Sequence, residues 1–193
     1  MTVALVLDFP GATRDQYDQV VERMHLDGRM APGGLLHVAG SYAGGWRVID
    51  LWEDIEHFAR FRDEQIAPHA GAVGMVQPEV RLIEVDEEKP GTGEASALVQ
   101  CVIIPGLDRA AFEAADREIR PNDEMPAAIT FHVNGPFEGG WCVIDGWTSK
   151  QARDEFLEAR VRPVFAKTQL KGEPKIEDLI VEATLRERAA VRA

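Results

Sequence analysis

The chain repeats one of its own segments at a fixed distance, and this duplication strongly limits what it can fold into. Residues 37–52, with the pattern HVxG…GGWxVIDxW, recur without a gap as residues 132–147, 95 positions later. The same offset pairs Pro10-Gly11 with Pro105-Gly106. Solenoid repeats have periods of about 20–50 residues, so a repeat of this length indicates a duplicated domain.

Length and charge narrow the class of protein. The chain has 193 residues, so each half is close to the size at which one core is only just sufficient, and we expect the halves to bury surface against each other. The net charge of −12 argues against nucleic acid or an anionic membrane as a partner, because both require clustered Lys and Arg. The start, Met1–Asp8, has no basic region, and no apolar run approaches the ~20 residues of a membrane span. We therefore expect a cytoplasmic protein.

The first half predicts the order β-α-β-β-α-β. A helix with a capping box at Thr13 and Gln16 should end at Asp27-Gly28, and a second helix should begin after Asp54 and end at Pro68. Ile55, Phe58 and Phe61 should point inward from that second helix. The expected strands are 3–8, 35–40, 46–52 and 78–85.

The second half predicts the same order, which is that of ferredoxin-like folds. Its helices should be capped by Asp108 and by Thr148 or Ser149. Its expected strands are 97–104, 129–135, 141–147 and 176–183. We predict a first repeat over 1–86, a linker over 87–95, a second repeat over 96–185 and a tail over 186–193.

The strands are apolar on both faces. In the third strand Trp46 and Val48 lie on one side, and Ile49 and Leu51 lie on the other. A sheet of this kind must be covered on both sides. We therefore predict an α+β fold in which two ferredoxin-like repeats pack sheet to sheet and close a barrel within one chain, as an intrachain pseudo-dimer that can self-associate further.

The motif resembles a known family. The pattern HVxG…GGWxVIDxW, followed by an Asp- or Ser-capped helix, is similar to the dimeric α/β-barrel superfamily, in particular to proteins grouped with the antibiotic biosynthesis monooxygenases. The resemblance covers nearly the whole chain in tandem form. It implies oxygenation of aromatic polyketide-type phenols without metal or flavin, with the protein supplying a proton acceptor and hydrogen bonds to the developing oxyanion.

Other members of the superfamily bind and degrade haem with an Asn, a Trp and a His. Asn134 is the hairpin asparagine of the second half, whereas Ala39 takes its place in the first half. This departure argues against haem chemistry in the first half. Haem remains a possible cofactor, and otherwise no cofactor is expected.

His37 and His132 are the best candidates for chemistry, because each stands at the matching place of an otherwise apolar strand. They are predicted to act as bases or hydrogen-bond donors. Asp50 and Asp145 lie on the strand paired with each histidine, and would orient the imidazole. Alternatively, the histidines are structural and the aspartates bond backbone amides, and a register slip of one residue would separate the pairs.

The aromatic residues of the hairpins are candidates for substrate contacts. Trp46, Trp52, Trp141 and Trp147 can wall a pocket for an aromatic ligand, or they can be core residues. Tyr42 and Phe137, at the turns, can form a lid, and only Tyr42 offers a hydroxyl.

Neither metal nor thiol chemistry is expected. The sequence has no HxxxH or clustered acidic spacing for a metal. Cys101 and Cys142 should approach each other if their strands are neighbours, as buried inert thiols or as a redox pair.

Three functions follow from this sequence. The first is a cofactor-independent monooxygenase-like enzyme. The second is a non-catalytic protein that binds a small apolar or aromatic ligand, and the third is a haem-binding or haem-degrading protein.

Overall fold

The chain divides into two compact units. The computed structural model describes residues 1–168 and 170–186. Unit 1 comprises Met1–Leu82 together with the segment that begins at Val181, and unit 2 comprises Ile83–Ile180. Most of the predicted tail, 187–193, lies outside the described residues. Among those residues, no helix combines the length and the apolar character needed to cross a membrane.

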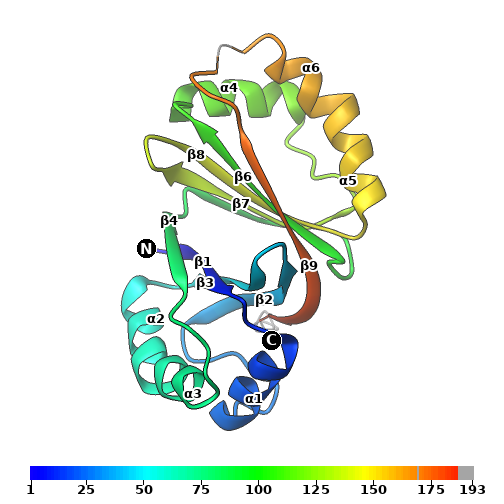
Figure 1. Ribbon diagram of the computed structural model, residues 1–193. Helices are drawn as coiled ribbons and strands as arrows, with labels where there is room; N and C mark the ends of the chain where they lie inside the picture. The colour runs from blue at the N-terminus through cyan, green and yellow to red at the C-terminus, as the bar shows by residue number, and fades with distance from the viewer. Residues whose placement is uncertain (169, 187–193) are drawn as a thin grey trace, which may run out of the picture. The chain divides into compact units, whose positions relative to one another are not determined.

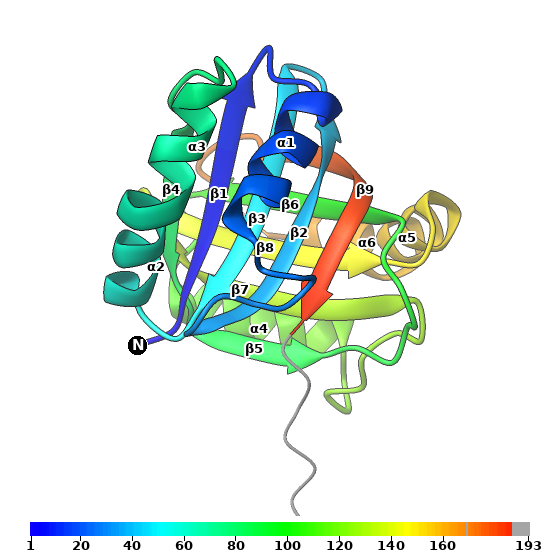
Figure 2. The same ribbon diagram turned by 90° about the horizontal axis from the view of Figure 1, so that it is seen from below.

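Unit 1 is an α+β unit in which helices cover one face of an antiparallel sheet (Figures 1 and 2). Strand β1 pairs with β3, and β3 pairs with β2. The strands follow the order β4-β1-β3-β2, and the next neighbour of β2 is β9. The elements are β1 (Val3–Pro10), α1 (Arg14–Met24), β2 (Gly34–Tyr42), β3 (Gly45–Trp52), α2 (Ile55–Phe61), the π-helical turn η1 (Arg62–Ile66), α3 (Ala67–Ala72) and β4 (Glu79–Glu84), whose last residues belong to unit 2.

Unit 2 has its elements in a similar order, and its strands are also antiparallel. Strand β6 pairs with β8 and with β9, and β8 pairs with β7. The strand order is β9-β6-β8-β7-β5. The elements are β5 (Glu87–Pro90), β6 (Leu98–Pro105), α4 (Arg109–Ile119), β7 (Ile129–Phe137), β8 (Gly140–Trp147), α5 (Lys150–Phe156), the π-helical turn η2 (Leu157–Val161), α6 (Arg162–Phe165) and β9 (Lys175–Arg186), which ends in unit 1.

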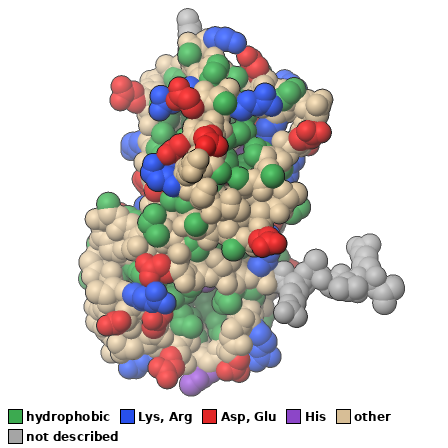
Figure 3. All heavy atoms as spheres, turned by 90° about the vertical axis from the view of Figure 1, so that its right-hand side faces the viewer, with side chains coloured by type: hydrophobic (Ala, Val, Ile, Leu, Met, Phe, Trp, Pro, Cys, Tyr) green, Lys and Arg blue, Asp and Glu red, His purple; other side chains and the backbone are tan. Residues whose placement is uncertain are grey.

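The core confirms that the strands are apolar on both faces. In β1, the alternate residues from Val3 to Phe9 pack with the helices of unit 1, and Ala4 and Val6, on the opposite face, are also fully buried. Burying a side chain such as Leu5 contributes about 1.5–3 kcal/mol. A few charged side chains, such as Arg47 and Asp50, are also buried, whereas the face shown in Figure 3 carries acidic side chains intermixed with Lys and Arg.

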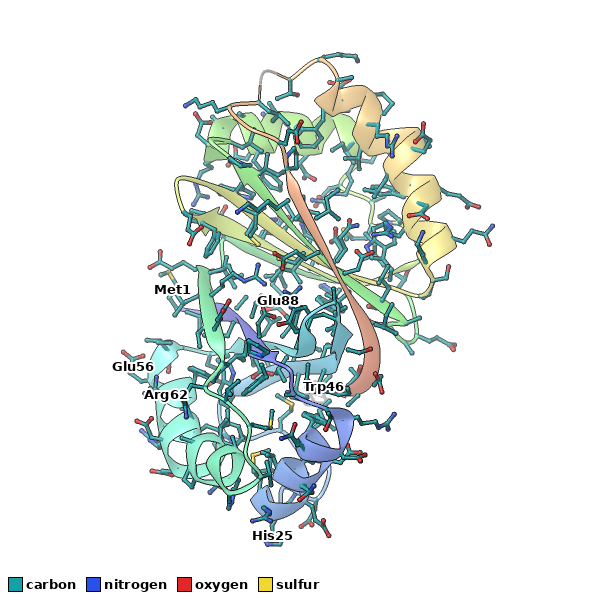
Figure 4. All side chains as sticks on the ribbon, viewed as in Figure 1. Met1, His25, Trp46, Glu56, Arg62 and Glu88 are labelled. Atoms are coloured by element: carbon teal, nitrogen blue, oxygen red, sulfur yellow. The ribbon has the colours of Figure 1, made fainter. Side chains whose placement is uncertain are left out.

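The helix ends differ in part from the sequence prediction. The capping box of Thr13 and Gln16 is confirmed, but α1 ends at Met24, because His25 adopts a left-handed conformation with φ of 50°. His25 thereby points away from the sheet at the end of α1 (Figure 4). Of the residues predicted to point inward from α2, Phe58 is buried, whereas Ile55 is 36% exposed.

The sequence predicted that the second helix ends at Pro68, and this prediction is wrong. The chain passes from α2 through η1 into α3, and Pro68 lies in the first turn of α3. A proline is tolerated there because the first turn does not require its missing N–H. The same arrangement places Pro163 at the start of α6, after η2.

The segment predicted to be a linker contains a strand. Residues Glu87–Pro90 form β5, which pairs antiparallel with β7, so that Glu87 lies opposite Asn134 and Lys89 lies opposite His132. Ladder hydrogen bonds come from the backbone, so a charged segment can form an edge strand without apolar side chains. The linker prediction is therefore wrong for these four residues, and Glu87 is brought to a histidine.

The predicted approach of the two thiols is confirmed. Cys101 and Cys142 lie on the paired strands β6 and β8, and their Sγ atoms are 3.6 Å apart. Both are buried free cysteines.

Candidate active site

Each unit contains a histidine–aspartate pair, as the sequence predicted. His37 on β2 lies directly opposite Asp50 on β3, and His132 on β7 lies opposite Asp145 on β8. The distance from Nδ1 to Oδ1 is 2.7 Å in unit 1 and 2.6 Å in unit 2. With Nδ1–H donating to the carboxylate, Nε2 carries the lone pair of a neutral imidazole. The structure therefore favours the orienting role of the aspartates over backbone capping.

In unit 1 the lone pair of the histidine is already used. The Tyr17 hydroxyl, from α1, lies 2.8 Å from Nε2 of His37. The two rings are nearly parallel, at 9°, and Tyr17 also packs on Trp46, with ring centroids 5.1 Å apart. Burial, and then the nearby charge of Asp50, raise the pKa of Tyr17 well above its ordinary value. The hydroxyl therefore stays protonated and donates to His37.

In unit 2 an amide and a carboxylate surround the histidine instead. Nδ2 of the buried Asn134 lies 2.9 Å from Nε2 of His132, and Oδ1 of Asn134 accepts a hydrogen bond from Nε1 of Trp141. Oε2 of Glu87 is 3.7 Å from Nε2. Burial raises the pKa of Glu87, but the hydrogen bond from Lys89 and the nearby positive charges together outweigh burial and hold the pKa below its usual value. Carboxylates near both ring nitrogens stabilise the positive charge that His132 gains with a proton.

The two pairs line cavities of very different size. The cavity beside His132 has a volume of about 260 Å³, whereas the cavity beside His37 has about 50 Å³. Smaller side chains line the larger cavity at three matching positions: Ala115 stands where unit 1 has Val20, Val102 where it has Leu7, and Ile104 where it has Phe9. The apolar side chains of the larger cavity include Val102, Ile104, Phe112, Ala115, Ile119, Met125, Ile129, Val143, Phe156, Leu157, Val161, Phe165 and Ile176. Of the two cavities beside the histidines, the larger has room for a ring system.

One polar residue of the larger cavity was missed by the sequence analysis. Gln100 on β6 lies opposite Asp145 and lines the cavity. It is 1% exposed, and its Nε2 has no hydrogen-bond partner among the described residues. Its signal in the sequence is a single polar side chain in the apolar run 98–104, where the other repeat has Leu5.

A second missed residue, Arg120, borders the same cavity. It is 6% exposed and stands where unit 1 has His25. Its guanidinium donates to both carboxylate oxygens of Asp116, at 2.8 and 2.6 Å, and lies 2.7 Å from the sulfur of Met125. Arg120 is thus held in place by its own helix.

The structure does not bring the predicted aromatic residues to these cavities. None of the four tryptophans lines either cavity, and all four are at most 2% exposed, which favours the core alternative. Tyr42 lies under the guanidinium of Arg47, 4.6 Å from its ring centroid, and neither Tyr42 nor Phe137 is among the lining residues. Asn134 acts through His132 and likewise does not line the cavity.

Two observations bear on metal ions and haem. Within the part of the chain that the structure describes, no group of three or more His, Cys, Asp or Glu side chains is placed to hold a metal. Haem iron requires a free axial ligand such as a histidine nitrogen. Nε2 of His37 is bonded to Tyr17, and Nε2 of His132 to Asn134.

No protein-family model and no curated protein sequence matches the chain. Solved structures do resemble it. A "putative monooxygenase" from Fusobacterium nucleatum is 12% identical with a TM-score of 0.71, covering 96% of this chain and 94% of that one. A "putative monooxygenase" from Lactobacillus acidophilus is 13% identical with a TM-score of 0.69, covering 96% of both chains. A mutant chlorite dismutase from Candidatus Nitrospira defluvii is 10% identical with a TM-score of 0.59, covering 92% of this chain and 90% of that one. At these identities the likeness shows an α+β fold related to ferredoxin-like proteins.

Proposed function

We propose that unit 2 is the active unit of a cofactor-independent monooxygenase acting on an aromatic, polyketide-type small molecule. One observation carries this proposal: the His132–Asp145 pair opens onto an apolar cavity of about 260 Å³. The cavity offers an aromatic ligand apolar walls and a few polar groups, the usual composition of small-molecule sites. The fold shared with the two monooxygenase-named structures supports the reaction class by analogy only.

The proposed chemistry begins with a proton transfer. Nε2 of His132 takes a proton from a ring carbon of the substrate, and Asp145 holds the opposite ring nitrogen and stabilises the imidazolium. Asn134 now occupies Nε2, so the substrate displaces its amide from that nitrogen.

Dioxygen then receives the electrons of the substrate carbanion. A C–O bond forms between the carbanion and one oxygen atom of O₂. The O–O bond breaks, the second hydrogen leaves the same carbon, and the other oxygen departs as water. A CH₂ group thus becomes a carbonyl, and no other oxidant is required.

We propose that unit 1 does not take part in this reaction. Its histidine is paired with Tyr17 and its cavity of about 50 Å³ is too small for an aromatic ring system. His37 and Asp50 would then be structural, although they share the geometry of the pair in unit 2.

Oxygen uptake with anthrone as substrate and no added cofactor tests this assignment. We expect His132→Gln to lower the turnover at least about 100-fold, the lower range for loss of a general base. His37→Gln is the matched control at the other repeat position and should stay within about twofold of wild type. Circular dichroism establishes that both variants fold. Uptake no faster than the uncatalysed reaction in the wild type, or full activity in His132→Gln, contradicts the proposal.

A non-catalytic ligand-binding protein is the second candidate. It is favoured by the contact between Asn134 and Nε2 of His132, whose side chain is only 6% exposed. In that case anthrone binds in the absence of oxygen, but no uptake follows when oxygen is admitted. Haem is tested in the same series by the Soret band of haemin. We expect no shift, because iron would have to displace Tyr17 or Asn134 from the histidine nitrogen.

We further propose that the two units pack sheet against sheet as a single-chain barrel. The strands are buried on the faces that do not pack with the helices, as at Ala4 and Val6. The ion pairs at the ends of β4 and β9 are also alike, since Glu182 contacts Arg14 and Asp86 contacts Arg109. Sedimentation should therefore show a monomer. A dimer that dissociates into unfolded chains would instead assign these faces to a second copy.

A further inference from the structure

We infer that the ligand of unit 2 carries a carbonyl oxygen that accepts a hydrogen bond from Nε2 of Gln100, on the edge of the ring system opposite the atom that meets His132. This inference rests on the proposed function to the extent that the cavity must bind a small molecule. It adds a specificity-determining residue and a requirement on the chemistry of the ligand.

The first support is the unpaired amide itself. Gln100 is 1% exposed, and its Nε2 has no partner among the described residues. An unpaired buried N–H is costly, and buried polar groups are nearly always bonded. The repeat accommodates an apolar side chain at this position, because unit 1 has Leu5 there, fully buried. Packing alone therefore does not require an amide in unit 2.

The carboxylates on either side of Gln100 are already bonded to other groups. Asp145, opposite on β8, accepts from His132, and Asp178, opposite on β9, accepts from Arg153 at 2.8 and 3.2 Å. The cavity that Gln100 lines is therefore the place where a partner for its amide can enter.

The spacing of the strands gives the arrangement of the ligand. Gln100 on β6, Asp145 on β8 and His132 on β7 form one row across the sheet. Adjacent strands are about 4.8 Å apart, so the backbones of Gln100 and His132 are separated by about 10 Å. Side chains reaching into the cavity from these two positions meet opposite edges of one ring. A donor on one side and a base on the other fit a carbonyl placed across the ring from an acidic C–H.

This arrangement gives Gln100 a defined role in the proton transfer. As Nε2 of His132 takes the proton from the ring carbon, the electron pair of the broken C–H bond moves through the ring to the carbonyl oxygen. That oxygen becomes an enolate, and a hydrogen bond from Gln100 is stronger to the enolate than to the neutral carbonyl. Gln100 therefore contacts the atom on which negative charge develops.

Anaerobic binding of a matched pair of compounds tests the inference. Anthrone and 9,10-dihydroanthracene share the tricyclic frame and differ in one carbonyl that is replaced by CH₂. Calorimetry without oxygen measures binding in the absence of turnover. We expect the wild type to bind anthrone about fivefold to tenfold more tightly, the value of one neutral hydrogen bond. In Gln100→Leu, which installs the residue of the other repeat, the two compounds should bind equally.

Gln100→Met provides a second variant of similar length, should Gln100→Leu fail to fold. Loss of the preference for anthrone in a folded variant that still binds dihydroanthracene supports the inference. A preference that persists without Gln100 overturns it. Equal binding of the two compounds by the wild type also overturns it, while leaving the cavity as a binding site. Binding of neither compound overturns this inference and the proposed function together.

Discussion

The hydroxyl of Tyr17 lies 2.8 Å from Nε2 of His37, where the hydroxyl or acidic C–H of a ligand would meet the histidine of an open site. The same position in unit 2 is Phe112, which stacks on Trp141 much as Tyr17 packs on Trp46, with centroid distances of 5.0 and 5.1 Å. The two aromatic rings are thus held alike and differ in one oxygen atom. In unit 1 the tyrosine hydroxyl contacts Nε2 of the histidine, whereas in unit 2 the phenylalanine offers no hydroxyl and the amide of Asn134 contacts Nε2 instead.

Phe112→Tyr should therefore close unit 2. The new hydroxyl is expected to reach His132 as Tyr17 reaches His37, and to compete with any ligand for Nε2. We predict at least about tenfold weaker anthrone binding, because the ligand must displace an internal hydrogen bond to a buried ring. Calorimetry measures the affinity. Phe112→Leu, which shortens the side chain without adding a hydroxyl, is the control and should retain binding. An unchanged affinity in Phe112→Tyr would show that Nε2 is not part of the ligand site.

The ionisation of Tyr17 is the second testable property. Burial and the charge of Asp50 raise its pKa above the ordinary value of 10.0. The unfolded chain then releases this proton first, so the unfolding free energy should fall as the pH rises above about 10. Below about pH 10, where Tyr17 is protonated in the folded and the unfolded chain alike, this loss of unfolding free energy is absent. The chain has two tyrosines, so the tyrosinate absorbance of the folded protein should show one late phase that Tyr17→Phe removes. Tyr42→Phe should leave that phase in place, and its loss there would contradict the assignment.

Pairing of the histidines with the aspartates was predictable from the sequence, because both follow from one repeated pattern. The matching positions of His37 and His132 singled them out, and the strand parity of Asp50 and Asp145 made them candidate partners. The pairing depended on the register, which the hairpin turn fixes. The order of strands and helices was predictable for the same reason, since the hydrophobic periods appear twice in the chain.

The differences between the two units were not predictable in the same way. The smaller side chains of Val102, Ile104 and Ala115 leave a cavity only because of how the surrounding helix packs. The hydroxyl of Tyr17 meets His37 through the tertiary packing of α1, which the helix pattern alone does not indicate. Gln100 and Glu87 reach the site through strand pairing. The approach of Glu87 was hidden because its charged neighbours resembled a linker.

The carboxylate of Asp145 provides the last prediction, which separates orientation of the base from binding of the ligand. Asp145→Asn keeps the shape of the side chain and an oxygen that can accept from Nδ1 of His132, but removes the charge that stabilises the imidazolium. The substitution should therefore slow the step in which His132 takes the proton from the substrate. We expect kcat for oxygen uptake to fall at least about 100-fold, while KM changes by less than about threefold. Asp50→Asn makes the same change in unit 1, where the histidine is bonded to Tyr17, and should leave kcat unchanged. If both variants lose activity equally, the two histidine–aspartate pairs act together, and the proposal that unit 1 takes no part in the reaction is wrong. If Asp145→Asn raises KM and leaves kcat intact, His132 binds the substrate and does not take its proton.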